Sequence, residues 1–271
     1  MPEALSTNWF AQQFKRTQPL FHQLDKNPTS LIDFVAKRKT YRLGVYFEHL
    51  IAFWLQNHPT YQLLAHDLQV FEGKQTKGAF DFLVSDGQGV HHWETCIKFY
   101  LSLNNSPHWM NWVGPHQKDR LGLKLNKTLN HQLQLSNTPS GQQALIKNNI
   151  ALPTSKKMWI KGILFTHWQT HPAQPRQGFP AKGIWMYADE LPDYLKDKSK
   201  FQWFVRKKPN WLSSVIAADQ PLLAAKDLLD YHFVRTTMFS EKLKSERVES
   251  KRIFICPASH RHTWPDLIPE S

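Results

Sequence analysis

Two apolar stretches of the chain hold the residues best suited to chemistry. Asp81 lies within the stretch 79–84, and Glu94 and Lys98 lie within the stretch 90–101. Both stretches are apolar enough to form central strands of a sheet. Acids on two neighbouring strands, with an amine nearby, are groups that can hold a divalent cation beside a phosphate.

The segment between these stretches predicts a hairpin that brings the two acids together. Its residues, Ser-Asp-Gly-Gln-Gly, are typical of a tight turn. If Asp86 pairs with Gly89, the same register places Asp81 opposite Glu94. Opposed side chains lie about 5 Å apart at Cβ, and two carboxylates this close repel unless a cation or a proton lies between them. We therefore expect Asp81 and Glu94 to bind Mg²⁺ (or Mn²⁺), since hard oxygen ligands select these ions.

Glu48 and Lys98 extend this site. Glu48 lies on a predicted helix with Gly44 and Ala52 four residues to either side, and these small residues allow close approach to a sheet. Alternation puts Lys98 on the strand face of Glu94, where its amine could orient a water molecule or stabilise charge on the phosphate. Asp81 and Glu94 could instead form ordinary salt bridges, and Glu48 could simply be solvated. Three acids and a lysine on one side of a sheet favour function, because buried unpaired charge is costly.

The elements that must position these residues form an α/β core. Apolar periodicity predicts the order helix, three strands, helix, strand, over residues 41–57, 63–71, 79–84, 90–101, 119–135 and 158–165. Residues 1–40 predict an N-terminal helical cap of one or two amphipathic helices. The core domain is therefore expected at residues 41–165.

Residues 166–271 are expected to form a C-terminal α/β elaboration packed on the core. Their apolar runs predict strands at 183–187, 201–205 and 252–256 and a long helix at 221–244. The segment 170–181, which is rich in Pro and Gln, predicts a loop.

The composition favours a polyanionic partner. Lys and Arg number 34 against 22 Asp and Glu, which gives a net charge of +12, and such an excess favours nucleic acid. No apolar run is long enough to cross a bilayer, and the N-terminus does not resemble a secretory signal. The two isolated cysteines, Cys96 and Cys256, fit a reducing compartment better than a disulfide framework. We therefore expect a cytoplasmic protein without membrane contact that binds nucleic acid.

A basic ridge beside the site is the candidate nucleic-acid contact. Lys124, Lys127 and His131 recur at helical spacing on the predicted helix 119–135, and Arg120 precedes them. The same pattern is typical of a solvated helix face, and that interpretation stays open. The sequence contains no P-loop, dinucleotide-binding, HExxH or GxSxG motif, so the chemistries that depend on these motifs have no local support.

These features together resemble the PD-(D/E)XK nuclease superfamily, whose core has the element order given above, an Asp that begins the motif and a Glu-x-Lys on the next strand. Within it, the chain resembles the bacterial domain-of-unknown-function family 1853 through the strings Tyr41-Arg42-Leu43-Gly44, Phe80-Asp81-Phe82-Leu83, Trp93-Glu94 with Lys98-Phe99-Tyr100, and Asp119-Arg120-Leu121. The resemblance implies a restriction-endonuclease-like α/β fold with a mixed central sheet. It also implies a Mg²⁺-dependent (or Mn²⁺-dependent) phosphodiesterase that acts on DNA or RNA.

By this resemblance Asp81 and Glu94 are metal ligands, Glu48 is the helix acid that joins them, and Lys98 is the catalytic lysine. The chain departs from the pattern at one position, since Cys96 stands two residues after Glu94, where the lysine is usual. Lys98 lies about 13 Å from Glu94 along an ideal strand. A catalytically inactive binding module or adaptor with the nuclease fold is therefore the alternative function.

Overall fold

The computed structural model of the protein describes residues 3–38, 40, 42–104, 108–170, 181–214, 221–246 and 248–267. The chain divides into two compact units. Unit 1 contains Met1–Ile97 and Leu125–Lys161, and unit 2 contains Lys98–Lys124 and Gly162–Ser271. Each unit combines helices with strands of a mixed sheet. Most of the predicted core and the predicted cap belong to unit 1, whereas residues 98–124 belong to unit 2.

Unit 1 contains the elements that were expected to position the site. In chain order they are β1 (Glu3–Ala4), α1 (Thr7–Lys26), α2 (Thr29–Ala36), α3 (Leu43–Gln56), β2 (Gln62–Glu72), β3 (Gln75–Ser85), β4 (Val90–Ser102), α4 (Leu121–Asn130), the 3-10 helix η2 (Gln132–Asn137), α5 (Pro139–Lys147) and β6 (Ser155–His167). The strands β4 and β6 and the helix α4 each continue into unit 2. The predicted order of helix, three strands, helix and strand is present as α3, β2, β3, β4, α4 and β6.

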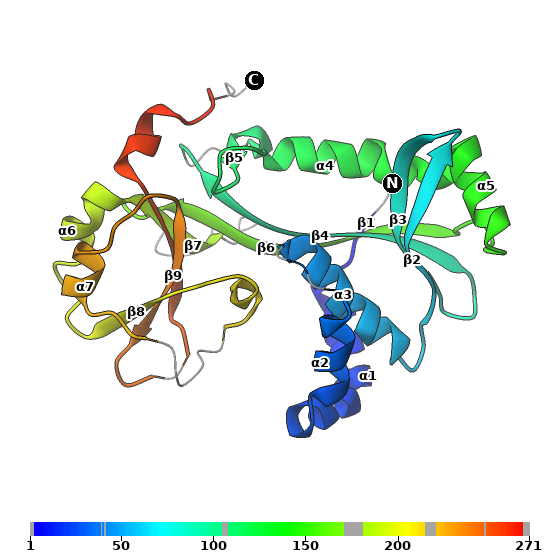
Figure 1. Ribbon diagram of the computed structural model, residues 1–271, viewed down its shortest axis with the longest axis horizontal. Helices are drawn as coiled ribbons and strands as arrows, with labels where there is room; N and C mark the ends of the chain where they lie inside the picture. The colour runs from blue at the N-terminus through cyan, green and yellow to red at the C-terminus, as the bar shows by residue number, and fades with distance from the viewer. Residues whose placement is uncertain are drawn as a thin grey trace. The chain divides into compact units, whose positions relative to one another are not determined.

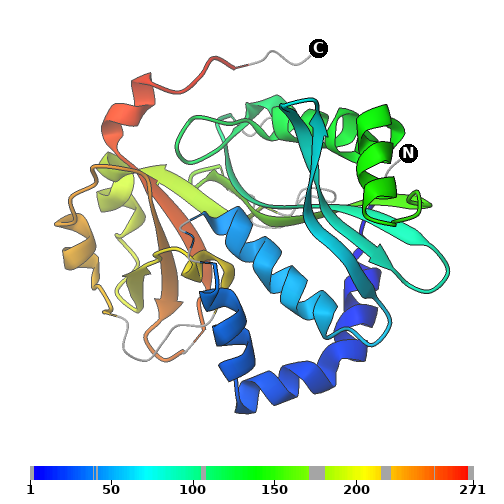
Figure 2. The same cartoon turned by 45° about the vertical axis from the view of Figure 1, so that its right-hand side comes forward.

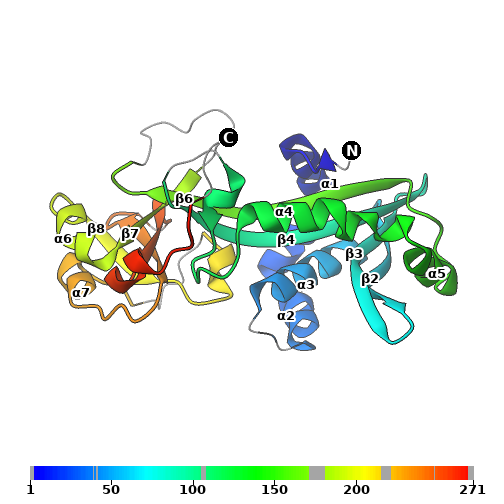
Figure 3. The same cartoon turned by 90° about the horizontal axis from the view of Figure 1, so that it is seen from above.

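The strands of unit 1 follow the order β2–β3–β4–β6, and Figure 3 shows β4 and β6 side by side. The pairs β2–β3 and β3–β4 are antiparallel. Phe82 pairs with Trp93 and Ser85 pairs with Val90, which confirms the register predicted from the turn. The short β1 pairs in parallel with β6, and the Leu5 N–H donates to the Met158 carbonyl at 2.9 Å.

Apolar side chains pack on both faces of this sheet. The α3-side cluster contains Ile51, Ala52, Leu55, Phe82, Val84, Trp93 and Trp159. The η2-side cluster contains Val70, Phe80, Leu83, Val90, Leu135 and Leu145. In Figure 1, α3 lies on one side of β4 and α5 on the other, as these clusters require. The sheet of unit 1 is therefore covered on both faces.

The N-terminal segment contains two helices, α1 and α2, as its amphipathic pattern predicted. Helix α1 begins at Ser6, whose hydroxyl accepts from the Trp9 N–H at 3.1 Å. Pro28 follows the end of α1 and begins α2, and Figure 2 shows the two helices, drawn in dark blue, meeting at a sharp turn. The Trp9 ring contacts the rings of Trp93 and Trp159 at centroid distances of 5.4 and 5.8 Å. Helix α1 is thereby attached to the α3-side cluster.

Unit 2 contains the remaining elements. They are β5 (Trp112–Val113), β7 (Ala181–Tyr187), α6 (Leu191–Tyr194), β8 (Phe201–Val205), α7 (Ala225–Leu229), β9 (Thr237–Leu243), β10 (Lys251–Cys256) and the 3-10 helices η1 (Trp109–Asn111), η3 (Ala188–Glu190), η4 (Asn210–Leu212) and η5 (Ala258–His262). The strand order is β6–β7–β10–β9–β8, with parallel pairing up to β10 and antiparallel pairing beyond it. The three strands predicted beyond residue 166 are confirmed as β7, β8 and β10.

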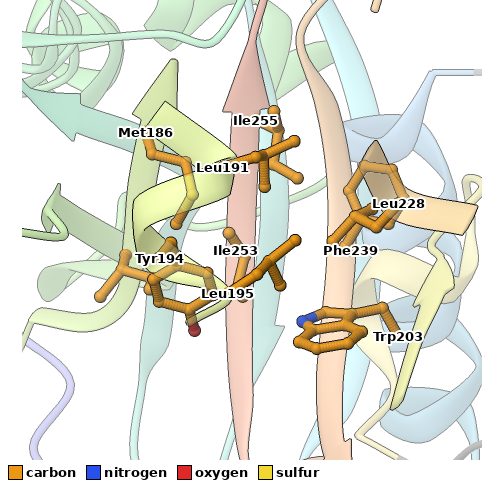
Figure 4. Packing of buried hydrophobic residues seen from close by; sticks show 10 residues of the cluster. Met186, Leu191, Tyr194, Leu195, Trp203, Leu228, Phe239, Ile253 and Ile255 are labelled. Carbon is orange, nitrogen blue, oxygen red and sulfur yellow. The ribbon is translucent and has the colours of Figure 1, made fainter. Parts of the chain in front are cut away.

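The core of unit 2 packs α6 and α7 against one face of these strands. Leu191, Tyr194 and Leu195 lie over Met186 and Ile253, as Figure 4 shows. Leu228 of α7 packs in the same cluster against Trp203 and Phe239.

Several predictions of individual elements are wrong. The long helix predicted over 221–244 is instead the five-residue α7 followed by the strand β9. Strand β9 is buried along nearly its whole length, so its sequence lacks the alternation that marks a strand. The helix predicted over 119–135 ends at Asn130 and continues as η2, and α5 was not predicted. The predicted loop at 170–181 lies outside the described residues apart from its two end residues.

None of the helices among the described residues is both long enough and apolar enough to span a membrane.

Candidate functional site

The candidate site lies where the regular pairing of β3 with β4 stops. Backbone pairing runs from Ser85 and Val90 to Phe82 and Trp93. At the next step the Thr95 N–H donates to Oδ2 of Asp81 at 2.8 Å instead of to a backbone carbonyl. The Asp81 N–H in turn lies 3.4 Å from Oε1 of Glu94. The two carboxylates therefore take part in the interaction between the strands at the position that the predicted register assigns to them.

The alternation of side chains along β3 shifts at the same place. Phe80 and Leu83 both belong to the η2-side cluster, although strict alternation would put them on opposite faces. Asp81 lies inside this shift. On β2 the pairs His66–Phe82 and Leu68–Phe80 leave Asp67 opposite Asp81, and Asp67 has a positive φ of 55°. Left-handed backbone is uncommon for a residue other than glycine, so both strands deviate from regular geometry at facing acids.

Glu48 of α3 is coupled to these acids. Burial is the largest cause that raises the pKa of the half-buried Glu48 carboxyl to about 7, followed by the negative charges of Asp81 and Asp67. Glu94 raises the pKa least, and the positive charge of Arg38 lowers it. The Nη2 atom of Arg38 lies 3.6 Å from Oδ2 of Asp67. Gly44 precedes Glu48 by one helical turn, and a Cβ at that position would lie 4.0 Å from Oε1 of Glu48. We call the four acids Glu48, Asp67, Asp81 and Glu94 the acidic centre.

Glu94 is held from the opposite face of the sheet. Its side chain is 1% exposed, and its two carboxylate oxygens contact Nε2 of His92 at 2.7 Å and Nε2 of Gln132 at 2.6 Å. Burial is the main cause that lowers the pKa of His92 to about 4. The imidazole is therefore neutral at pH 7, and we assign its proton to Nε2 because the carboxylate can only accept. Gln132 belongs to η2, so Glu94 lies on the η2 side, whereas Glu48 approaches from the α3 side.

Lys98 lies in unit 2 and has a carboxylate partner there. Its Nζ atom lies 2.7 Å from Oδ2 of Asp119, and the same oxygen accepts from the Tyr100 hydroxyl at 3.1 Å. Cys96, which occupies the position where the superfamily has its lysine, is a half-buried thiol. The predicted catalytic amine is thus engaged with an acid that the sequence analysis did not single out.

The predicted basic ridge divides between the two units. Arg120 donates to the carbonyls of Met110 at 3.0 Å and Asp266 at 2.6 Å, so its guanidinium holds backbone of unit 2. Lys124 also belongs to unit 2, whereas Lys127 and His131 belong to unit 1 and are exposed.

Three residues of the site were not predicted as functional: Asp67, His92 and Gln132. Asp67 carried a usable signal, because an acid in the middle of an apolar strand is unusual. His92 lies two residues before Glu94, so strand alternation alone could have placed it on the same face. Gln132 carried no signal, since it reaches Glu94 only because α4 gives way to η2.

The residue types of the acidic centre are those that bind divalent cations, but their arrangement does not form a metal site among the described residues. Carboxylate oxygens are the ligands of Mg²⁺ and Mn²⁺, and the mutual repulsion at Glu48 is what a bound cation relieves. Among the residues that the structure describes, no group of three or more His, Cys, Asp or Glu side chains is arranged to hold a metal ion. The side chains as placed are instead engaged by Thr95, His92 and Gln132.

Comparison with known proteins gives one family. Neither the curated proteins nor the solved structures gave a significant match to this chain. Residues 1–255 match the family described as Domain of unknown function (DUF1853), which is the family that the strings around Asp81 and Glu94 resemble. Since the match covers nearly the whole sequence, the chain belongs to the DUF1853 family.

Proposed function

We propose that the acidic centre binds Mg²⁺ or Mn²⁺ and that the protein hydrolyses phosphodiester bonds in DNA or RNA. The observation that carries the proposal is that Asp81 and Glu94 make the contacts between β3 and β4 where regular pairing stops, while their charges and that of Asp67 raise the pKa of Glu48. Like charges in a half-buried position are unfavourable, and such positions are retained mainly where charge has a role. The element order of unit 1 supports a restriction-endonuclease-like core for this centre.

Glu48, Asp81 and Glu94 are the proposed ligands. A divalent cation there would polarise a phosphate oxygen and lower the pKa of a bound water. The chain's own residues prepare the ligands. Thr95 orients Asp81 through its N–H at 2.8 Å, and the neutral His92 fixes Glu94 without cancelling its charge. Lys98 is the amine that the resemblance implies for this reaction.

The charge distribution supports a nucleic-acid substrate. Residues 120–188 contain nine Lys and Arg and no Asp or Glu. The unit 1 part of this run includes η2, which contacts Glu94, and Lys156, which contacts Asn137 at the end of η2. Such a surface attracts the phosphate backbone irrespective of sequence.

Calorimetric titration with Mn²⁺ tests the metal site. We expect one site in the wild type, lost in Asp81→Asn and Glu94→Gln and retained in Asp25→Asn, whose carboxylate is exposed on α1. Cleavage of labelled single-stranded and double-stranded DNA and RNA with Mg²⁺ or Mn²⁺ then tests the reaction. Wild-type protein that binds no Mn²⁺, with or without nucleic acid, would contradict the proposal.

A binding module without turnover is the second candidate function. It is favoured by the Lys98–Asp119 contact at 2.7 Å and by Cys96 at the usual lysine position, because both remove the amine from its expected place. Mn²⁺-dependent binding of nucleic acid without cleavage would select this function over the enzyme.

A further inference from the structure

Strand β6 brings a second lysine to the acidic centre. Strands β4 and β6 are neighbours in the sheet. The Thr154 N–H donates to the Val90 carbonyl at 2.7 Å, and Nδ1 of His91 lies 2.7 Å from Oγ of Ser155. The beginnings of the two strands therefore lie side by side. Lys156 is the next residue of β6, and His92, which holds Glu94, is the next residue of β4.

The contacts with η2 put Lys156 and Glu94 on the same face of the sheet. Glu94 accepts from Gln132 at the start of η2, and Nζ of Lys156 donates to Oδ1 of Asn137 at the end of η2 at 2.7 Å. One short helix thus touches both residues.

The neighbouring residue Lys157 has a different environment. It pairs with Glu3 of β1 through the backbone, and alternation along β6 puts its side chain on the opposite face from that of Lys156. Lys157 therefore provides a control with the same charge at nearly the same place in the sequence.

The partner of Lys156 also distinguishes it from Lys98. Lys98 contacts the carboxylate of Asp119, whereas Lys156 contacts the neutral amide of Asn137. An amide leaves the positive charge of an ammonium group uncompensated, so Lys156 can still attract a phosphate. Asn137 in turn donates to Oε1 of Gln134 at 2.7 Å, which fixes the amide orientation.

We propose that Lys156 is the lysine that binds the substrate phosphate beside Glu94, with the role that the superfamily pattern gives to a lysine at the position of Cys96. This inference rests on the proposed function, and it names the amine that this function needs. A lysine on β6 can stabilise charge on the phosphate just as a lysine on β4 would, because the effect depends only on where the ammonium group lies. The metal ligands stay as proposed.

Four variants of the full chain test the inference: Lys156→Ala, Lys156→Arg, Lys157→Ala and Lys98→Ala. We expect Lys156→Ala to lower the cleavage rate about 100-fold, as the loss of one transition-state donor does, while Mn²⁺ affinity stays within about twofold. Lys156→Arg should restore part of the rate. Lys157→Ala should stay within about threefold of the wild type, and Lys98→Ala should lower the rate less than Lys156→Ala does.

Two other results are distinguishable. In the first, the wild type binds Mn²⁺ and cleaves, but Lys156→Ala cleaves as fast as Lys157→Ala, or Lys98→Ala is the variant that abolishes cleavage. Lys156 then has no role in the reaction, and the proposed function stands. If the wild type binds Mn²⁺ and nucleic acid without cleaving, the readout is affinity for a labelled oligonucleotide. Lys156→Ala should then weaken binding at least fivefold more than Lys157→Ala, and equal weakening would overturn the inference. A wild type that binds neither metal nor nucleic acid ends both proposals.

Discussion

Both units bury carboxylates, but the surroundings of those carboxylates differ. In unit 2 the carboxylate of Glu241, which is 2% exposed, accepts from the Tyr194 hydroxyl at 2.5 Å, from Nζ of Lys198 at 3.2 Å and from Nε1 of Trp203 at 3.3 Å. In unit 1 the carboxylate of Glu48 has other acids as its strongest charged neighbours, and its pKa is raised to about 7. The first arrangement satisfies a buried charge, and the second leaves a repulsion.

Glu249 of unit 2 differs even more from Glu48, because two arginines pair with its carboxylate. Its carboxylate lies 3.0 Å from Nη2 of Arg206 and 2.8 Å from Nη2 of Arg252, and it also accepts from Ser240. Both arginines are buried. Complete pairing of this kind is what a structural network requires, whereas residual repulsion is typical of sites that act on something else. The comparison therefore agrees with the proposal of a site in unit 1, and we expect the paired charges of unit 2 to contribute to stability.

The largest effect is expected from breaking the unit 2 network. Glu249→Ala leaves Arg206 and Arg252 buried without their carboxylate, and we expect the free energy of unfolding to fall by about 3–5 kcal/mol. Urea denaturation followed by tryptophan fluorescence measures the change. A loss below about 1 kcal/mol would mean that the network is solvated and that the contrast between the units is wrong.

An intermediate effect of opposite sign is expected from Glu48→Gln. Because the pKa of Glu48 is raised from 4.5 to about 7, its neutral form stabilises the folded protein at low pH, and this contribution is lost as the pH rises through 7. Removing the charge should therefore stabilise the protein at pH 8 by about 1 kcal/mol after allowance for solvent screening, and by much less at pH 4.5. Thermal unfolding at both pH values measures the difference.

Added Mn²⁺ sharpens that comparison. A metal ion bound at the acidic centre should stabilise the wild type at pH 8 more than it stabilises Glu48→Gln. The higher melting temperature that Glu48→Gln has without metal should therefore become equal to that of the wild type or fall below it. Glu72→Gln, at an exposed position of β2, serves as the control and should show neither effect. Destabilisation by Glu48→Gln at pH 8 without metal would show that Glu48 is a structural acid like Glu249.

The smallest effect is expected at an exposed ion pair of unit 2. Nζ of Lys196 lies 2.7 Å from Oδ1 of Asp193, and both side chains are exposed. Asp193→Ala should change the free energy of unfolding by less than about 0.5 kcal/mol, because water screens exposed pairs. A larger change, measured by the same urea denaturation, would mean that burial does not decide the strength of ion pairs in this protein.

The sequence predicted the strands of the hairpin well, because local chemistry determines them. Asp86 and Gly87 form a turn of their own, and Oδ1 of Asp86 accepts from the N–H groups of Gln88 and Gly89 at 3.0 and 3.2 Å. This turn fixes the register that brings Asp81 toward Glu94. Strand β9 was missed because it is buried between β8 and β10, and its environment comes from strands distant in the sequence.

The site was predictable only in part, for the same reason. The acids at positions 48, 81 and 94 could be singled out from their types and their places on single elements. The irregular backbone at Asp67 and Asp81 involves two paired strands, β2 and β3, at the same level. The apolar periodicity of either strand alone does not reveal it. The partner of Lys98 lies 21 residues away on a turn, so its engagement could not be read from the spacing of β4.

The pairing of β1 with β6 also determines when unit 1 can be completed during synthesis. Glu3 and Ala4 pair with Lys157 and Met158, so this segment needs partners that are synthesised about 150 residues later. At the usual rates of about 5–20 residues per second, the N-terminal segment waits roughly 8–30 s for this strand. Contacts this distant in sequence also slow folding itself. During that interval the apolar faces of α1 and α3 have no β6 to cover them.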